Sequence, residues 1–550
     1  MTINTSFSMK LNYILLLLVC PFLLMAQPGS ESGITPINST LTYQGFDETA
    51  AHFGTAEYNI YYDNIDGVLD KPIFFVDGFD PNDSRTIPLM YSLLNFGMAG
   101  ENLGDLIRDE GYDLVVLNFP TYVRAADGAT INGGADYIQR NAFILMELLN
   151  VINGMKTGTE ENVVIGPSMG GLISRYALKY MEDNALDHET RLYVSFDSPH
   201  RGANVPMSIQ YLFNYMVNGA PAITELAPLV DGLLGSPAAK QMLIDHFLGH
   251  VGMDGVTQTG SNLPIGAPNF RDAFQSELDG MGFPENTRNI AISNGSSQGS
   301  LTGSIGLELL NHLFVTSATT RATITLNFTP AENLNSQVTD FVGEAFVGIW
   351  IPVAFYSASS QSPPTVDGLD SAPGGQFDLN SFDDGSSTLI TEFVNNLTSQ
   401  YFNFIPTISG LAITETDDWY DLPNVSARFN TPFDASYIPA INEPHVQVNA
   451  GNVAFTLDEI LNPPLSNDDF EINSFRIAKN PINDELIILS TSSFNNAIIN
   501  IVDMTGKVVY NDANVSLDNR TSIPLTLESG LYILRIEADN KRFNTKIIIR

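Results

Sequence analysis

The stretch Gly166-Pro167-Ser168-Met169-Gly170-Gly171 follows a short apolar run, residues 162–165 (NVVI), which predicts a strand. It precedes residues 172–181 (LISRYALKYM), whose apolar spacing predicts a helix. A strand that turns directly into a helix needs glycines beside the turn, because a Cβ there would collide with the neighbouring strand and helix. The residue at the apex, Ser168, is then held in a strained backbone conformation with its hydroxyl lifted above the sheet.

The order strand, G-x-S-x-G, helix is the pattern of a nucleophile elbow. A serine hydroxyl is barely ionised at neutral pH. Such chemistry therefore also needs a base, an acid that orients the base, and backbone donors that stabilise an oxyanion. An ordinary glycine-rich turn is the alternative interpretation, and the rest of the chain has to decide between the two.

Six apolar runs predict strands, and segments with helical spacing lie between several of them. The predicted strands cover residues 57–63, 72–76, 114–119, 162–165, 192–196 and 289–293, and the predicted helices include 102–109 and 135–152. Strands that alternate with helices predict an α/β fold with a mostly parallel sheet. Ligands of such folds bind at the carboxyl ends of strands, where Gly78, Ser168 and Asp197 all fall.

The α/β domain is expected to cover residues 40–465. Residues 203–285 are rich in Leu, Ala, Gly and Met and predict a helical cap, and residues 300–400 predict a large insertion that contains β structure. Within the insertion, residues 322–328 alternate as a strand does, whereas residues 306–315 (GLELLNHLFV) predict an apolar helix.

One stretch of the insertion resembles a membrane segment in its composition. Residues 341–356 (FVGEAFVGIWIPVAFY) are strongly apolar, but Glu344 and Pro352 interrupt them and they are too short to span a bilayer. We expect buried strands or an apolar flap there, and no transmembrane anchor.

The charge of the chain is acidic and unevenly distributed. Its 550 residues include 62 Asp and Glu against 25 Lys and Arg, a net charge of −37, yet residues 475–550 carry 9 basic and 8 acidic residues. This change in composition predicts a domain boundary before residue 475. An acidic main domain argues against nucleic acid and anionic lipid surfaces as partners, because their phosphates would be repelled.

The N-terminus is expected to be a signal peptide, residues 1–26. Lys10 precedes an apolar run, residues 11–25, and Ala26 offers a cleavage site. Cys20, the single cysteine, lies in this run, so the mature chain would contain neither disulfides nor thiolate metal ligands. Val19 stands where a lipoprotein anchor would need a small residue.

Residues 475–550 differ in kind from the rest, because short β segments separated by turns predict a small all-β sandwich. Asn480-Pro481, the hairpin 501–509 (IVDMTGKVV), residues 527–534 (LESGLYIL) and residues 546–549 (KIII) follow one another in this order. Together they resemble the C-terminal sorting domain of the type IX secretion system. The resemblance implies export by that machinery to the medium or to the outer-membrane surface.

Residues 60–450 resemble an α/β-hydrolase of the lipase and GPI-inositol-deacylase-like type. The resemblance rests on the elbow with residues 173–177 (ISRYA), on Asp77-Gly78-Phe79 where that family has His-Gly-Phe, and on residues 196–203 (FDSPHRGA), which are like the lipase T-P-H-R-G turn. Asp77 departs from the family pattern and leaves the backbone role at that place intact. The resemblance implies a serine hydrolase whose triad follows the chain order serine, acid, histidine.

Seven histidines are candidates for the base. His52 precedes the elbow, His188 lies in a charged loop and is expected to be solvated, and His200 belongs to the PHRG turn, where the family has a structural histidine. His312 is expected to pack within its apolar helix. His445, which follows a loop and precedes a helical segment near the end of the domain, is where the family's catalytic histidine lies, and it is our candidate.

Two features of the sequence could indicate a metal site. His246 and His250 lie four residues apart in a segment expected to be helical, but no third ligand accompanies them. The Asp-rich loops at 80–83 and 378–384 lack the spacing of a calcium loop. No metal and no cofactor are therefore predicted, and calcium binding is left open.

The acid is the least determined member of the triad. No carboxylate follows the strand that ends at Ser293, because the next residues are 294–299 (NGSSQG). A carboxylate from another loop could orient the imidazole instead, and Asp434, eleven residues before His445, is our candidate. The alternatives are Asp367, Asp370, Asp417 and Asp418. The backbone N–H groups of Phe79 and Met169 are expected to form the oxyanion hole.

These features predict a secreted serine hydrolase that cleaves carboxylic esters through an acyl-enzyme. The apolar insertion and the cap would build an acyl pocket with a lid, so an ester or lipid substrate is expected. An amidase or acyltransferase would use the same residues. The alternative is a non-catalytic surface adhesin or binding protein on a degenerate hydrolase scaffold, favoured by Asp77 and by the absent acid after Ser293. Acyl and alcohol specificity and oligomeric state are left open.

Overall fold

The structure is a computed structural model. It describes residues 27–550 except 221, 224, 225, 228, 384, 386, 422–430, 463–474, 484, 491, 492, 504, 505, 519, 539 and 540. The predicted signal peptide, residues 1–26, lies outside the described residues. The chain divides into two compact units, Met1–Ile460 and Leu461–Arg550. Among the described residues, no helix has both the length and the apolar character that crossing a membrane requires.

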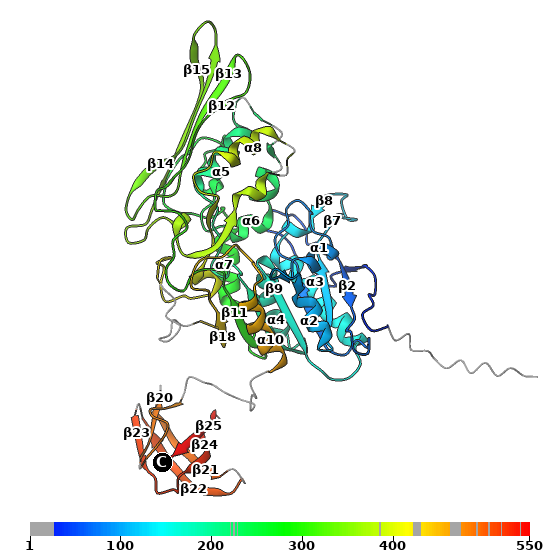
Figure 1. Ribbon diagram of the computed structural model, residues 1–550, viewed down its shortest axis with the longest axis vertical. Coiled ribbons are helices and arrows are strands. Elements are labelled where there is room, and N and C mark those ends of the chain that lie inside the picture. The colour runs from blue at the N-terminus through cyan, green and yellow to red at the C-terminus, as the bar shows by residue number, and fades with distance from the viewer. Residues whose placement is uncertain are drawn as a thin grey trace, which may run out of the picture. The chain divides into compact units, whose positions relative to one another are not determined.

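An eight-stranded sheet forms the centre of the first unit, in the order β1-β2-β6-β3-β9-β10-β11-β18 (Figure 1). Neighbouring strands from β6 to β18 pair parallel, whereas β1 pairs antiparallel with β2, and β2 pairs antiparallel with β6. The strands are β1 (Thr35–Asn38), β2 (Thr55–Tyr61), β3 (Pro72–Val76), β6 (Asp113–Asn118), β9 (Asn162–Pro167), β10 (Thr190–Phe196), β11 (Arg288–Ile292) and β18 (Ala435–Tyr437). The predicted α/β fold with a mostly parallel sheet is confirmed.

Helices cover the sheet, which explains why its central strands are continuous apolar runs rather than alternating ones. Every residue of β3 and of β6 is buried. The helices that flank the strands are α1 (Ile87–Ser92), α2 (Leu103–Asp109), α3 (Ile138–Met155), α4 (Met169–Asp183), α7 (Arg271–Met281) and α10 (Ala450–Leu461). Two short hairpins, β4–β5 (Asn95–Phe96 and Glu101–Asn102) and β7–β8 (Thr121–Val123 and Thr130–Asn132), lie between them, and η1 (Gly133–Ala135) precedes α3.

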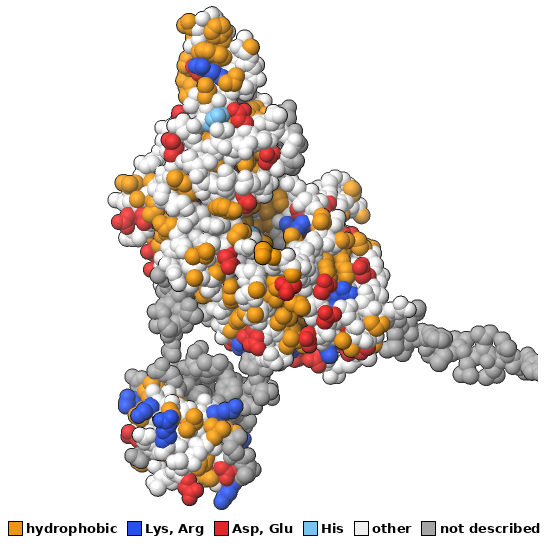
Figure 2. Space-filling view, in the orientation of Figure 1, with side chains coloured by type: hydrophobic (Ala, Val, Ile, Leu, Met, Phe, Trp, Pro, Cys, Tyr) orange, Lys and Arg blue, Asp and Glu red, His pale blue; other side chains and the backbone are white. Residues whose placement is uncertain are grey.

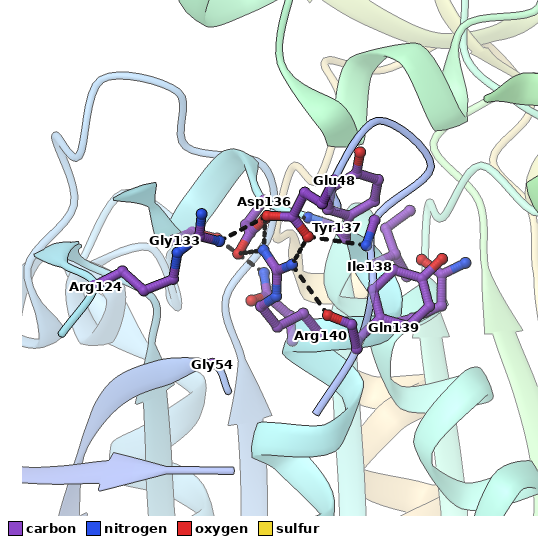
Figure 3. A network of polar contacts seen from close by, with 12 residues as sticks. Glu48, Gly54, Arg124, Gly133, Asp136, Tyr137, Ile138, Gln139 and Arg140 are labelled. Carbon is purple, nitrogen blue, oxygen red and sulfur yellow. Dashed lines mark hydrogen bonds and ion pairs between the residues drawn. The ribbon is translucent and has the colours of Figure 1, made fainter. Parts of the chain in front are cut away.

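A buried ionic network fastens the segment before β2 to the start of α3 (Figure 3). Arg140 of α3 is almost fully buried, donates to both carboxylate oxygens of Asp136 at 2.7 and 2.8 Å, and pairs with Glu48. Burial raises the pKa of Asp136, and Arg140 opposes that rise. Arg124 holds the other oxygen of Glu48 at 2.6 Å. Each buried charge therefore has a partner, as its desolvation requires.

The cap follows β10 and is less uniformly helical than expected. It consists of α5 (Met207–Asn218), η3 (Leu229–Leu234), α6 (Pro237–Met242) and the single turn η4 (Phe247–Gly249), before α7. α5 is buried along most of its length because the insertion packs on it.

The insertion lies between β11 and β18 and contains a second sheet, in the order β12-β13-β14-β15. These strands are β12 (Glu308–Val315), β13 (Thr320–Asn327), β14 (Asn335–Phe346) and β15 (Trp350–Gln361). The rest of the insertion comprises η5 (Leu369–Ser371), β16 (Gly374–Asp378), η6 (Leu379–Phe382), α8 (Thr388–Asn395), β17 (Tyr401–Pro406) and α9 (Thr407–Gly410). One end of the four-stranded sheet packs on α5, and the other end projects away from the unit (Figure 1).

The prediction of an apolar helix at residues 306–315 is wrong, because most of this segment is strand β12. Leu310, Phe314 and their neighbours pair antiparallel with β13. An apolar run this short is compatible with either structure, and here pairing with the adjacent strand decides it. His312 consequently lies on a strand, with its Nε2 2.8 Å from Glu392 Oε1.

From Phe475 onward, the described residues of the second unit form strands in two sheets. β19 (Phe475–Ile477), β20 (Glu485–Ser490) and β23 (Arg520–Pro524) form one sheet, and β22 (Val508–Leu517), β21 (Phe494–Asp503), β24 (Gly530–Ala538) and β25 (Lys541–Ile549) form the other. Alternate apolar side chains of these strands, among them Leu486, Ile499, Ile501, Leu534 and Ile547, make a core of their own. The expected small β domain is confirmed.

Candidate active site

Ser168 occupies a strained turn between β9 and α4. Its φ of 54° and ψ of −128° are values that a residue with a side chain rarely adopts. A Cβ on Gly166 would collide with the backbone of Gly170, and a Cβ on Gly170 would meet the carbonyl oxygens of Val76 and Asp77 at 2.5 and 2.8 Å. The two glycines are thus required by close approach of neighbouring backbone, as the sequence predicted.

Ser168 and His445 are brought together. Ser168 Oγ and His445 Nε2 lie 2.8 Å apart, although the two residues are 277 positions apart in the chain. Both side chains are partly exposed, so a molecule from solvent can reach them. The serine hydroxyl therefore has an adjacent nitrogen that can accept its proton.

Asp197, at the carboxyl end of β10, completes a hydrogen-bonded chain with these two residues. Its Oδ2 lies 2.6 Å from His445 Nδ1, and its side chain is fully buried. When Nδ1–H donates to Asp197, Nε2 is left as the acceptor for the Ser168 hydroxyl. The other carboxylate oxygen, Oδ1, accepts from the backbone N–H of Asn294 at 3.0 Å. The carboxylate is thereby fixed at both oxygens.

Asp434 does not occupy this position, which corrects the prediction made for it. It lies just before β18, where its backbone N–H donates to Asn289 O and its Oδ2 accepts from Asn289 N at 2.8 Å. Asn289 is near the start of β11, so Asp434 sits at the amino edge of these parallel strands. His445 lies at the opposite, carboxyl edge. The prediction was wrong because it relied on proximity in sequence.

The four alternative carboxylates have other partners. Asp370 is buried and accepts from Asn204 Nδ2 and Thr329 N. Asp367 accepts from Glu332 N, Asp417 pairs with Arg201 at 2.7 Å, and Asp418 accepts from Tyr420 N. Each of the four carboxylates therefore binds a group other than His445.

Strand β16 of the insertion holds the histidine loop and covers Asp197. The backbone N–H of His445 donates to Gln376 O at 2.7 Å, and Gln376 N donates to Glu443 O at 2.9 Å. A Cβ on Gly375 would stand closer to Asp197 Oδ2 than any real Cβ approaches another atom. The ring of Phe404 meets the His445 imidazole edge-on, with centroids 4.9 Å apart. The imidazole is therefore fixed by backbone, carboxylate and aromatic contacts.

Phe79 and Met169 lie on either side of Ser168. A Cβ on Gly78 would be 3.2 Å from the Cβ of Ser168, so the loop that carries Phe79 runs directly against the serine. Met169 is the first residue of α4. Among the described residues, neither backbone N–H donates to a protein acceptor. Two free donors beside a serine are what an oxyanion hole requires.

Asp77 fixes the loop that carries Phe79. Its Oδ1 accepts from Gly78 N at 2.8 Å and from Arg85 Nε at 2.9 Å, and Arg85 in turn donates to Phe79 O at 2.8 Å. Burial raises the pKa of Asp77 to about 6, although the Arg85 guanidinium lowers it. The aspartate that departs from the family pattern thus binds an arginine that clamps the loop.

His200 and His188 have structural partners. His200 is buried with its Nε2 2.8 Å from Ser195 Oγ, and burial holds its pKa well below the usual range. His188, expected to be solvated, is instead buried, and its Nδ1 accepts from Thr190 N. Its loop folds back on α4 and β10, which removes the ring from water.

His246 and His250 do not lie on one face of a helix. Only the single turn η4 separates them, and His246 Nδ1 accepts from Leu248 N, while His250 Nε2 lies 2.7 Å from Asp245 Oδ1. Burial lowers the pKa of His246 to about 4. Among the described residues, no group of three or more His, Cys, Asp or Glu is placed to hold a metal ion.

An apolar cavity of about 40 Å³ lies next to the triad. Its walls are entirely apolar and come from the oxyanion loop, the cap and the insertion: Phe79, Ala203, Val205, Leu233, Ala239, Met242, Leu243, Phe377, Phe382, Phe402 and Phe404. Of these wall residues, Phe404 contacts the His445 ring, and Phe79 follows Gly78, which runs against Ser168.

Asp197 is the functional residue that the sequence analysis missed. Its signal was present, because it ends the strand after the elbow, at the carboxyl edge where ligands bind. The site after β11, where the family's chain order places the acid, is occupied instead by Asn294, whose backbone donates to Asp197.

Comparisons with known proteins agree with this fold. Residues 102–222 match the family model described as a PGAP1-like alpha/beta domain, and residues 479–550 match the secretion system C-terminal sorting domain. The comparison with curated proteins found no match.

The comparison with solved structures returned lipases and another α/β-hydrolase among its matches. The mature form of a Bacillus licheniformis lipase is 12% identical over 49% of this chain and 74% of its own, with a TM-score of 0.23. Its propeptide form is 10% identical over 95% and 97%, with a TM-score of 0.30. A peroxisomal alpha-beta-hydrolase from Saccharomyces cerevisiae is 12% identical over 48% and 74%, with a TM-score of 0.25. At these values the likenesses carry no argument about activity. The first unit thus contains a segment similar to a PGAP1-like alpha/beta domain, and the second unit contains a segment similar to a secretion system C-terminal sorting domain.

Proposed function

We propose that this protein is an exported serine hydrolase that cleaves carboxylic esters through an acyl-enzyme. The observation that carries the proposal is the hydrogen-bonded chain Ser168, His445, Asp197, with the serine on a strained turn and the acid buried. An arrangement of nucleophile, base and orienting acid is recognised by its geometry and not by the positions of the residues in the sequence.

In the first half of the reaction, Ser168 Oγ attacks the ester carbonyl and His445 Nε2 takes the hydroxyl proton. Asp197 holds the imidazole in the productive tautomer and stabilises the imidazolium that forms. The amides of Phe79 and Met169 donate to the tetrahedral oxyanion. His445 then gives its proton to the leaving alcohol, and the acyl group stays on Ser168 as an ester.

In the second half, water attacks the acyl-enzyme. His445 accepts a proton from the water as it adds to the carbonyl, and returns that proton to Ser168 Oγ as the carboxylic acid departs. The acyl group lies in the apolar cavity beside Phe79 throughout. Since the cavity has only about 40 Å³ of space, short acyl chains fit without rearrangement of the cap.

The sorting domain supports export to the cell surface or medium. We propose that a signal peptide at residues 1–26 directs the first membrane crossing and that the type IX machinery recognises residues 475–550. The single cysteine would be lost with that peptide, and the triad needs no thiol.

A fluorophosphonate probe tests the proposal, because it reacts covalently with an activated serine. The purified protein should be labelled and should hydrolyse p-nitrophenyl acetate. Ser168→Ala should abolish both. Ser174→Ala is the matched control, since Ser174 lies on the same helix and its hydroxyl donates to Gly170 O. Absence of labelling in a folded wild-type protein would refute the enzyme assignment and favour a binding protein.

A further inference from the structure

The projecting end of the four-stranded sheet carries a cluster of exposed apolar side chains. We define the apolar tip as Val315, Phe346, Val347, Ile349, Val353 and Phe355, whose side chains are between 43% and 69% exposed. They belong to the ends of β12, β14 and β15 and to the turn that joins β14 to β15. Figure 2 shows hydrophobic side chains gathered at this end of the unit.

The sheet changes character along its length. From Tyr356 onward, alternate residues of β15 are buried, and the Tyr356 ring stacks on Tyr215 of α5 at 4.4 Å. Thr339 of β14 donates to Ser208 O of the same helix. Before Tyr356, no residue of β15 is buried. One half of the sheet is therefore anchored on α5, and the other half presents apolar side chains to water.

The tip contains no unpaired charge. Arg321 and Glu344 are the only charged residues in 313–323 and 342–356, and their side chains pair at 2.6 Å. The Arg321 guanidinium also lies over the Trp350 ring, 4.2 Å from its centroid. Moving this end out of water would therefore leave no isolated charge behind.

From these observations we infer that the apolar tip inserts into an uncharged or zwitterionic lipid surface. A narrow end with apolar side chains on several strands can enter a fluid layer, whereas a folded partner would need a flat complementary face. Trp350 pairs with Phe346 next to the turn of the tip, and tryptophan is enriched at membrane–water interfaces. The open edges of the sheet restrict insertion to the headgroup region, because unpaired backbone groups are not tolerated deeper.

The charge of the rest of the chain selects the type of surface. The whole protein carries a net charge of −37, so an anionic membrane would repel it. An uncharged or zwitterionic surface lets the tip enter its headgroup region without that repulsion.

The tip also has a structural connection to the triad. A row of aromatic rings in contact runs from Phe404, beside His445, through Phe377 and Phe382 to Phe213 of α5, with centroid distances of 5.4 to 5.8 Å. Phe213 and Phe314 of β12 line a common apolar cavity at the base of the sheet. A role for the tip in presenting lipid esters to Ser168 rests on the proposed function, whereas binding to lipid does not.

Flotation of the full-length protein with phosphatidylcholine vesicles tests the inference. The wild type should float with the vesicles, and Val347→Ser/Ile349→Ser/Phe355→Ser should lower the partition coefficient by about tenfold or more. Phe53→Ser/Ile65→Ser/Val123→Ser is the matched control, because these side chains are 54–68% exposed elsewhere on the same unit. This control variant should float as the wild type does. Vesicles that contain phosphatidylserine should bind the wild type less well.

Three results would overturn the inference. The first is a wild type that does not float, and the second is an equal loss of flotation in both triple variants. The third is a wild-type dimer that the tip variant dissociates in analytical ultracentrifugation, which would make a second copy the occupant. Hydrolysis of soluble p-nitrophenyl acetate, measured on the same samples, reports separately on the proposed function and should be unchanged in both triple variants.

Discussion

Asp197 Oδ2 and His445 Nδ1 lie 2.6 Å apart although 248 residues separate them in the chain. The aspartate ends a strand of the central sheet, and the histidine sits on a loop that follows the insertion. This hydrogen bond joins the carboxyl end of β10 to the loop between β18 and α10, and it is the reason why we propose Asp197 as the acid.

We expect Asp197→Asn to lower kcat by about 10⁴-fold, because the amide cannot hold the imidazole in the tautomer that accepts the serine proton. Initial rates with a p-nitrophenyl ester measure the effect. Asp434→Asn is the matched control: Asp434 is exposed, and an asparagine oxygen can still accept from Asn289 N. A large loss in Asp434→Asn with an active Asp197→Asn would reverse the assignment.

We expect Gly375→Ala to lower kcat by at least about tenfold while the protein stays folded. The new methyl group would overlap Asp197 Oδ2, so the carboxylate or β16 must move, and misplacement of an orienting group by a fraction of an ångström is costly in catalysis. Gly280→Ala provides the comparison, because a Cβ at Gly280 meets nothing within 4 Å. Equal rates for the two variants would show that β16 does not determine the position of the acid.

We expect Arg85→Ala to lower kcat and to make stability more dependent on pH. The pKa of Asp77 is raised by burial to about 6 in the folded protein, against about 4 in the unfolded chain. The contribution of this group to stability is therefore complete below pH 4 and is lost as the pH rises through 6. Without Arg85 the ionised carboxylate has no cation, so the loss in unfolding free energy should reach about 2–3 kcal/mol at pH 8 and be smaller at pH 4.5.

Denaturant titrations at the two pH values measure this difference, and initial rates measure kcat. Arg288→Ala serves as the control, since the Arg288 side chain is 29% exposed, close to the 25% of Arg85, and pairs with Glu459 far from Phe79. An Arg85→Ala enzyme with unchanged kcat would mean that the clamp does not position the Phe79 amide.

We expect Leu233→Ala to shift acyl preference toward longer chains. Leu233 lines the apolar cavity beside the triad, and its truncation enlarges a space of about 40 Å³. The ratio of kcat/KM for octanoate to acetate esters should rise by roughly tenfold. Leu234→Ala, at the next position but outside the cavity wall, should reduce stability without changing that ratio. The same ratio in all three proteins would place the acyl group elsewhere.

The elbow could be predicted from sequence because its pattern is local. Gly166, Ser168 and Gly170 lie within five consecutive residues, and a Cβ on Gly166 would meet the helix that follows. The collision at Gly170 comes from the end of β3, which the parallel sheet brings alongside β9. The fold class was predictable for a similar reason, since buried parallel strands such as β3 and β6 are continuous apolar runs bounded by turns.

The acid could not be predicted by distance along the chain, because the edge of the sheet decides which carboxylate is available. Asp434 is close to His445 in sequence but lies at the amino edge of β11 and β18, whereas Asp197 lies at the carboxyl edge. The direction of the strands, rather than spacing along the chain, indicates which carboxylate lies near His445. The helix prediction for the segment with His312 was wrong for a related reason. Its apolar run is compatible with a helix or a strand, and its pairing with β13 makes it a strand.

The backbone hydrogen bonds between Gln376 and the loop of His445 limit how far this chain could be shortened. Residues between β11 and β18 look dispensable, as surface elaborations often are, and a linker could close the gap they leave. Such a truncated chain would still place Ser168 and Asp197 at the carboxyl edge of the sheet. His445, however, would lose the backbone hydrogen bond to Gln376 that holds its loop. The insertion is thus part of the proposed catalytic centre, and a shortened chain would need a replacement for β16.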